Sequence, residues 1–81
     1  MDNIRITSAT ELYCIFGKPV RHSISPVMHN AAFAEAAIDA VYLAFEPASI
    51  GDAVSAMRTI GIRGASVTIP YKIDAIRHLD A

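Results

Sequence analysis

Three short apolar runs alternate with stretches of helical character along this chain of 81 residues. The runs are LYCIF, VYLAFE and ASVTI, at residues 12–16, 41–46 and 65–69. Each run is nearly continuous in apolar residues, which is typical of strands that are covered on both faces of a sheet. Strands that alternate with helices over short connections form parallel sheets with right-handed crossovers. The sequence therefore predicts an α/β fold, a βαβαβα three-layer sandwich with a mostly parallel sheet.

Three stretches between and after these runs are predicted to be helices. Residues 26–38 begin with a proline and contain five alanines, the best helix-forming residue. Ser49 and Asp52 resemble a capping box, and they open a second helix with apolar residues at helical spacing. Gly61 is expected to end that helix. A last helix is expected to open at Pro70, with apolar side chains on one side at Ile73, Ile76 and Leu79.

The predicted helix at 26–38 is apolar nearly all round, because its few polar residues do not form one broad face. Such a helix is usually buried. A domain of this size buries only about 60–65% of the surface that its unfolded chain exposes, yet 53% of the residues are hydrophobic. We therefore expect further protein against this helix, either more of the same polypeptide or a second subunit in a homodimer.

Charge and the lack of long apolar stretches exclude several classes of partner. Seven Lys and Arg against eight Asp and Glu give a formal charge of −1, which argues against nucleic acid and against anionic membrane surfaces. No stretch reaches the roughly 20 apolar residues of a membrane span. Residues 1–10 lack the apolar core of a signal peptide. We expect a soluble, cytoplasmic protein.

The single cysteine and the histidines do not form a recognisable ligand set. Cys14 allows no intrachain disulfide, and its apolar neighbours indicate a small buried hydrophobe. His22 and His29 have no further ligands at metal-binding spacing. We therefore expect no metal site.

The stretch HSISP follows the first predicted strand, and it holds two serines just before a helix. Serine before a first-turn proline is a common N-cap, so Ser25 can be explained as a capping residue alone. Ser23 lies two residues upstream and is not needed for a cap. Two hydroxyls beside the free N–H groups of a helix N-terminus suit a carboxylate or a phosphate. No glycine-rich nucleotide motif is present, so a nucleotide phosphate is not indicated.

The stretch VTIPYK ends the third predicted strand and delivers a lysine to the last helix. A cation in the first turn opposes the helix dipole, so helix stability does not explain Lys72. A lysine there can hydrogen-bond a substrate hydroxyl or exchange a proton with it, and the plain alternative is an exposed surface lysine. Thr68 can offer a hydroxyl to the same ligand, or serve only the strand. Both motifs follow strands, at the edge where parallel sheets bind ligands.

FGKPVRHSISPVMHNAAF and GASVTIPYK together resemble the N-terminal, substrate-binding domain of shikimate dehydrogenase, over about residues 12–79. The resemblance implies an NADP-dependent oxidoreductase that reversibly reduces 3-dehydroshikimate to shikimate. It implies that Ser23 and Ser25 hold the substrate carboxylate and that Thr68 contacts ring hydroxyls. Lys72 matches the catalytic lysine, which would also bind the substrate. Ser66 stands where the family usually has Asn, so one side chain near the pocket is shorter.

The resemblance also implies what else such an enzyme contains. In the family, the remaining substrate ligands and the NADP-binding Rossmann domain lie downstream of this region, so no cofactor-binding residue is expected in this chain. We therefore expect a truncated part of a larger two-domain dehydrogenase, inactive alone. Residues 1–10 would be a lead segment, and residues 11–81 the substrate-binding domain, incomplete at its C-terminus. The lead segment would also fit a junction with a dehydroquinate dehydratase, since some members carry that fusion.

Other functions remain open. One is a quinate/shikimate dehydrogenase with relaxed substrate or NAD preference, which the cofactor domain would decide. Another is a non-catalytic module that senses shikimate or quinate. The presence of Lys72 argues against sensing, because sensing needs the carboxylate contacts more than a proton relay. The plainest alternative is a soluble α/β fragment in which the motifs are coincidental.

Overall fold

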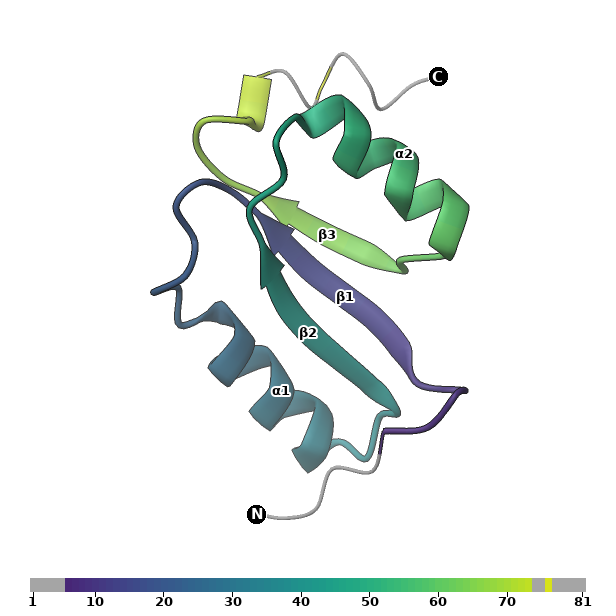
Figure 1. Ribbon diagram of the computed structural model, residues 1–81. Coiled ribbons are helices and arrows are strands. Elements are labelled where there is room, and N and C mark those ends of the chain that lie inside the picture. The colour runs from purple at the N-terminus through teal and green to yellow at the C-terminus, as the bar shows by residue number, and fades with distance from the viewer. Residues whose placement is uncertain (1–5, 74–75, 77–81) are drawn as a thin grey trace.

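A parallel sheet forms the centre of the computed structural model, which describes residues 6–73 and 76 (Figure 1). The central strand is β1 (Glu11–Phe16), and it pairs on one side with β2 (Ala40–Phe45) and on the other with β3 (Gly64–Val67). Both pairings are parallel, and the order is β2-β1-β3. The expected parallel sheet is therefore confirmed.

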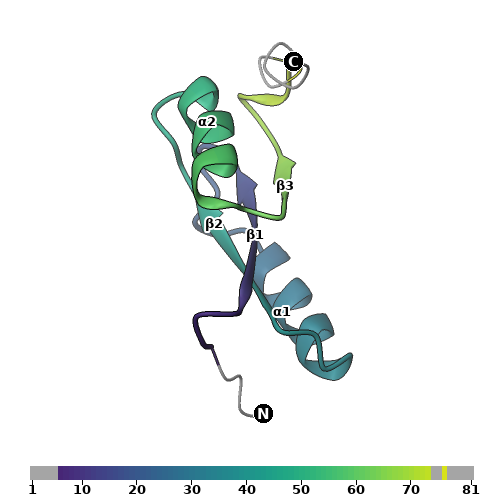
Figure 2. The ribbon, with the colours of Figure 1, turned by 90° about the vertical axis from the view of Figure 1, so that its right-hand side faces the viewer.

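Helices α1 (Ser25–Glu35) and α2 (Ile50–Ile60) lie on opposite faces of this sheet, as Figure 2 shows. Successive side chains of a strand point to opposite faces. In β1, Cys14 and Phe16 accordingly pack with α2, whereas Ile15 packs on the α1 side. The arrangement is the predicted three-layer α/β sandwich.

Two small apolar clusters, one on each face, make up the core. The buried members of the α2-side cluster are Cys14, Phe16, Ile50, Ala53 and Val54. The α1-side cluster consists of Ile15, Val20 and Tyr42, with Phe33 of α1 packed against it. Cys14 has no exposed surface, and burial raises the pKa of its thiol to about 11. Its predicted role as a buried hydrophobe is confirmed.

The ends of α2 match their sequence signals. The Ser49 hydroxyl accepts a hydrogen bond from the Asp52 N–H at 3.1 Å, as a capping residue does. Gly61 follows the last turn with φ 79°, a left-handed conformation that favours glycine. The predicted start and stop of this helix are therefore confirmed.

Helix α1 ends three residues before the predicted end of the segment 26–38. The Ile38 N–H donates to the Phe33 carbonyl at 2.9 Å, and the Ala37 N–H donates to the Ala34 carbonyl at 3.2 Å. This pair of bonds is a Schellman motif, and Ala37, with φ 57°, occupies the position that is usually glycine. The predicted boundary was wrong because the sequence carries no glycine at this stop.

The third strand and the last helix also differ from their predicted bounds. β3 ends at Val67, two residues before the end of the apolar run 65–69, because the chain turns there. Pro70 lies in that turn and does not open the helix; Lys72 is the first helical residue. Leu79 of the predicted apolar stripe lies outside the described residues.

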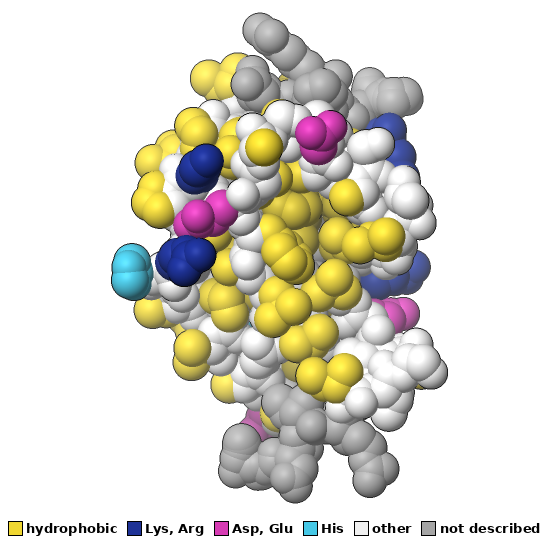
Figure 3. Space-filling model, in the orientation of Figure 1, with side chains coloured by type: hydrophobic (Ala, Val, Ile, Leu, Met, Phe, Trp, Pro, Cys, Tyr) yellow, Lys and Arg dark blue, Asp and Glu magenta, His cyan; other side chains and the backbone are white. Residues whose placement is uncertain are grey.

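Much apolar surface is left uncovered. Figure 3 shows hydrophobic side chains gathered over the face of the molecule that bears α2. The exposed large apolar side chains are Ile6, Ile24, Val27, Met28, Ile38, Leu43, Phe45, Ile60, Ile69, Ile73 and Ile76. α1 buries none of its residues. The predicted excess of apolar surface is thus present, and the protein expected to cover it stays a prediction. Within the described residues, no helix has the length and apolar character of a membrane span.

Candidate functional site

The loops that follow β1 and β3 meet at the carboxyl edge of the sheet, where ligands of parallel sheets bind. Lys18 N–H donates to the Ile69 carbonyl at 3.1 Å, and Thr68 N–H donates to the Phe16 carbonyl at 2.9 Å. Figure 1 shows both loops at the arrow ends of the strands. The two predicted motifs therefore start from neighbouring points of one edge.

Gly17 makes this close approach possible. A Cβ at Gly17 would lie 2.3 Å from the methyl carbon of Thr68 and 2.5 Å from Cγ1 of Val20, and both separations are sterically forbidden. The Thr68 methyl therefore packs directly over the Gly17 backbone.

Ser23 and Ser25 lie at the N-terminus of α1, but their local roles differ from the predicted ones. The N-cap residue is Ile24, which makes no side-chain cap hydrogen bond, and Ser25 is already helical. The predicted capping role of Ser25 is therefore wrong. The Ser23 hydroxyl instead accepts a hydrogen bond from the Ser25 N–H at 3.1 Å. Within the described part of the chain the Ser25 hydroxyl has no hydrogen-bond partner, and it is half-buried.

Lys72 is exposed, and its neighbour Tyr71 anchors the turn that presents it. The Tyr71 ring packs against the α2-side cluster, and its hydroxyl donates to the Pro47 carbonyl at 2.6 Å. The Tyr71 N–H donates to the Thr68 carbonyl at 3.0 Å. Sequence reasoning did not identify this anchor, because its only signal is an aromatic residue beside the motif lysine.

Glu46 anchors the other loop. Its Oε2 accepts a hydrogen bond from the Val20 N–H at 2.9 Å, and its Oε1 lies 4.0 Å from Nε of Arg21. The bond from Val20, then the Arg21 and Lys18 charges, hold the pKa of Glu46 below its ordinary value of 4.5, against the opposing effect of desolvation. Sequence reasoning missed Glu46, although an acidic residue directly after an apolar strand marks the carboxyl edge of the sheet.

Ser66 is linked to the neighbouring strands through Tyr42. Tyr42 belongs to β2 and is buried. Its hydroxyl donates to Oγ of the exposed Ser66 at 3.1 Å. The Tyr42 ring stacks on the imidazole of His29 with 4.2 Å between ring centroids. The Tyr42 side chain thus reaches across β1 on the α1 side of the sheet and orients Ser66.

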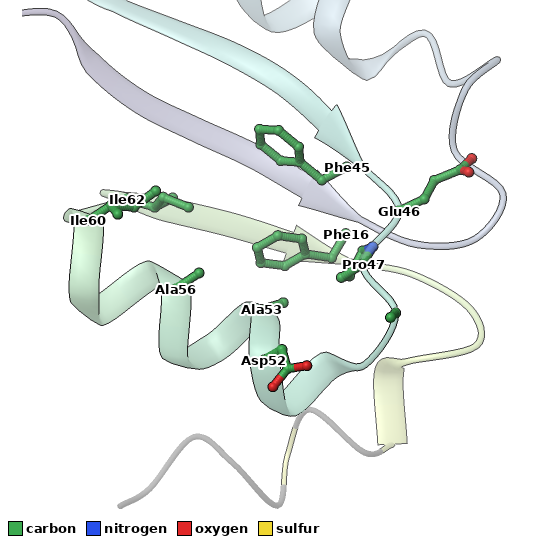
Figure 4. A pocket seen from close by; sticks show the side chains of 10 residues that line it. Phe16, Phe45, Glu46, Pro47, Asp52, Ala53, Ala56, Ile60 and Ile62 are labelled. Atoms are coloured by element: carbon green, nitrogen blue, oxygen red, sulfur yellow. The ribbon is translucent and has the colours of Figure 1, made fainter.

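An apolar groove of about 420 Å³ lies on the α2 side of the sheet (Figure 4). Its lining comes from the ends of β1 and β2 and from α2, and includes Phe16, Phe45, Ala56, Ile60 and Ile62. The lining is mostly apolar, and its two charged residues, Glu46 and Asp52, are both acidic. Such a lining suits packing against apolar groups rather than a polar ring with a carboxylate. Among the described residues no three His, Cys, Asp or Glu side chains are grouped so that they could hold a metal ion.

Comparison with known proteins identifies related chains. A family model described as the shikimate dehydrogenase substrate binding domain matches residues 15–81. A shikimate dehydrogenase (NADP(+)) of Thermococcus kodakarensis is 51% identical over 74 residues, which are 89% of this chain and 27% of that protein.

Solved structures agree with this similarity. Shikimate 5-dehydrogenase of Listeria monocytogenes, in complex with shikimate and NAD, is 43% identical with a TM-score of 0.90, over 98% of this chain and 28% of that chain. The Thermus thermophilus enzyme in complex with shikimate is 30% identical with a TM-score of 0.82, over 88% and 28%. This chain therefore spans about a quarter of the length of these relatives.

Proposed function

Because the chain belongs to the shikimate dehydrogenase substrate-binding domain family, we propose that it is the substrate-binding part of an NADP-dependent shikimate dehydrogenase. The parent enzyme would reversibly reduce 3-dehydroshikimate to shikimate. One observation supports this most. Both motif loops begin at the same carboxyl edge of the sheet, and the hydrogen bond from the Lys18 N–H to the Ile69 carbonyl joins them. The names of the relatives and the shikimate bound to two of them support the substrate.

The serine pair is proposed to hold the substrate carboxylate. Ser25 offers a hydroxyl at the first turn of α1, and Ser23 lies two residues before it. The positive end of the helix dipole and the N–H groups of the first turn favour an anion there. A ring that carries one carboxylate would thus be oriented by its charged end.

The loop after β3 is proposed to meet the reacting end of the ring. Thr68 would bind a ring hydroxyl, and Lys72 would bind the oxygen that changes between carbonyl and hydroxyl. In the reducing direction the Lys72 ammonium would give a proton to that oxygen, and in the oxidising direction the neutral amine would take it back. Ser66, oriented by Tyr42, would face the remaining hydroxyls through a shorter side chain than Asn.

The hydride would be supplied by NADPH, bound outside this chain. The 81 residues contain no glycine-rich dinucleotide motif. We therefore place the cofactor on a Rossmann domain in the part of the relatives' length that this chain does not span, and this chain's residues would bind and orient the substrate only.

A chimera tests the proposed function. Residues 6–81 would replace the matching segment of the Listeria monocytogenes enzyme, which is 43% identical, so that the cofactor domain is complete. We expect shikimate-dependent reduction of NADP, measured by the absorbance of NADPH. Lys72→Ala should abolish turnover and largely retain shikimate binding. Arg63→Ala removes an exposed cation directly before β3, and this control should keep its rate.

Each alternative gives a different result in this chimera. An unchanged rate in Lys72→Ala contradicts the catalytic role of the lysine. Faster turnover of quinate than of shikimate identifies a quinate/shikimate dehydrogenase. A folded chimera that binds shikimate without turnover identifies a sensing module instead.

Three further predictions accompany the proposal. Residues 1–10 are proposed to be a lead segment, and residues 11–81 the domain itself, which limited proteolysis can test. A homodimer is expected to show in analytical ultracentrifugation. Cytoplasmic location can be checked by cell fractionation.

A further inference from the structure

We propose that Glu46 and Tyr71 are positioning residues, which set the spacing of the serine pair and Lys72 by fastening two loops to the junction after β2. The serine loop is residues 17–24, and the lysine loop is residues 68–72. The proposal rests on the proposed function, because it assigns roles toward the same substrate site.

The Glu46 attachment reaches both serines through hydrogen bonds. The Glu46 carboxylate accepts the Val20 N–H at 2.9 Å, and Val20 is only 5% exposed, so this bond lies beside the core. The Val20 carbonyl accepts the Ser23 N–H at 3.0 Å, and the Ser23 hydroxyl accepts the Ser25 N–H at 3.1 Å. In Figure 4 the Glu46 carboxylate points toward the loop after β1.

The Tyr71 attachment starts from the next residue of the same junction. The Pro47 carbonyl accepts the Tyr71 hydroxyl at 2.6 Å, and the ring is held by the α2-side cluster. The Tyr71 N–H donates to the Thr68 carbonyl at 3.0 Å, which closes the turn before Lys72. The turn is therefore closed by its own backbone bond and fixed to Pro47 through the Tyr71 side chain.

The junction itself is well fixed. Glu46 and Pro47 lie between the last residue of β2 and Ser49, the N-cap of α2, so they are attached to the sheet and to the helix that supplies most of the α2-side core. The direct bond between the loops, from Lys18 to Ile69, acts only near their bases. Catalytic groups tolerate little displacement, since a misplacement of about 1 Å can cost about 100-fold in rate.

The Glu46 attachment depends on its negative charge. The charged groups around it are Lys18 and Arg21 of the serine loop, and Asp52 of α2, which lines the same groove. The Arg21 side chain is 80% exposed with 4.0 Å to the carboxylate, so this ion pair is weak. The charge-assisted bond from Val20 is the stronger contact, and a neutral amide at position 46 would weaken it.

Amide hydrogen exchange of the 81-residue chain, followed by NMR, tests the serine-loop attachment without ligand. Glu46→Gln is expected to speed exchange of the Val20 amide about tenfold and to shift the Ser23 and Ser25 amide resonances. Glu35→Gln, at the exposed end of α1, is the matched control. Val20 exchange equal to that of the control overturns the proposal for this loop.

Tyr71→Phe tests the lysine-loop attachment, because it removes the hydroxyl and keeps the ring. The Thr68 and Lys72 amide resonances are expected to shift. Tyr13→Phe is the matched control, since the Tyr13 hydroxyl has no hydrogen bond to the described residues. Thr68 and Lys72 resonances that stay in place overturn the proposal for this loop.

Titration of the same variants with shikimate separates positioning from simple stabilisation. Glu46→Gln is expected to lose the shikimate-induced shifts at Ser23 and Ser25 and to keep those at Lys72, and Tyr71→Phe is expected to do the reverse. Shifts that weaken together at all sites contradict the proposal. If the wild-type chain does not respond to shikimate, the proposed function fails for this chain, and the exchange and resonance measurements alone decide the positioning roles.

Discussion

Helices α1 and α2 both have 11 residues, yet different interactions fix them to the sheet. α2 buries Ile50, Ala53 and Val54, whereas α1 buries no residue. α1 is attached through Asn30, whose side-chain amide accepts the Tyr42 N–H at 2.8 Å and donates to the Tyr42 carbonyl at 2.9 Å. Apolar burial holds one helix, and directional hydrogen bonds with a few ring contacts hold the other.

The helix with little burial is the one that carries the serine pair. Val27 and Met28 in its first turns are 72% and 59% exposed. Segments with few buried apolar contacts open at a lower free energy than the core. The α2 side is therefore fixed by apolar burial, whereas α1, which carries Ser25, is fixed mainly by hydrogen bonds. Loss of buried side chains from α2 should therefore lower global stability, whereas on α1 loss of the Asn30 bonds should do so and loss of exposed apolar side chains should not.

The largest expected effect comes from a matched pair of valines. Val54 in α2 is 7% exposed, so Val54→Ala is expected to lower the free energy of unfolding by about 2–3 kcal/mol through lost burial and a cavity. Val27 in α1 is 72% exposed, and Val27→Ala should change it by less than about 0.5 kcal/mol. Urea denaturation measures both. Equal losses would contradict the contrast between the helices.

Asn30→Ala tests the polar attachment of α1. The change leaves the N–H and carbonyl of the buried Tyr42 without these partners, and it should cost about 2 kcal/mol in the free energy of unfolding. Thr59→Ala removes an exposed hydrogen bond on α2 and is the control. A loss no larger than that of Thr59→Ala would mean that Asn30 does not hold α1.

The C-terminal ends of the helices give opposite expectations. Gly61→Ala should destabilise the protein by about 1 kcal/mol, because φ is 79° and a Cβ there touches nothing that could compensate. Ala37→Gly should stabilise it by about 1 kcal/mol, because Ala37 already holds φ at 57°. Thermal unfolding of the two variants checks the signs. A destabilised Ala37→Gly would refute the Schellman assignment.

The N-terminal ends of the two helices also give different expectations. Ser49→Ala removes the cap bond to the Asp52 N–H and should cost about 1 kcal/mol. Ser25→Ala removes no cap bond, so the free energy of unfolding should change by less than about 0.5 kcal/mol. The Ser25 variant should instead lose shikimate affinity. Equal stability losses in urea denaturation would show that Ser25 caps α1 after all.

The smallest expected effect is a pH dependence from Glu46. Its pKa in the folded protein lies below the ordinary value of 4.5, chiefly because the Val20 N–H donates to the carboxylate. The stabilisation is therefore complete above that ordinary value and is lost as the pH falls through the lower, folded-state value. Stability measured from pH 6 downward should fall less steeply in Glu46→Gln. Parallel curves for the two proteins would contradict this contribution.

Much of the fold follows from local patterns in the chain. The three apolar runs and the signals at Ser49 and Gly61 are local, and the structure confirms the strands and the second helix. The end of α1 was not predictable in this way, because Ala37 takes a left-handed conformation without being glycine. The start of the last helix at Lys72 depends on the turn closed by Tyr71 and Thr68, which Pro70 alone does not reveal.

The motifs of the candidate site could be predicted from the sequence, but the residues that fix the two loops to the sheet could not. Ser23, Ser25, Thr68 and Lys72 were predicted because their residue types and spacing match a family. Glu46 and Tyr71, which are proposed to position them, were missed, because Glu46 lies 26 positions from Val20 and Tyr71 lies 24 positions from Pro47. Contacts between residues so far apart in the sequence form only when the strands pair.

An amide NMR titration of the 81-residue chain with shikimate tests the central claim most directly. We expect a dispersed spectrum with shifts at Ser23, Ser25, Thr68 and Lys72, and weaker shifts at the two serines with shikimate methyl ester, which lacks the carboxylate charge. A dispersed spectrum with no change at these four residues at millimolar shikimate, or with changes confined to the apolar groove around Phe45, would contradict a shikimate site at this edge of the sheet.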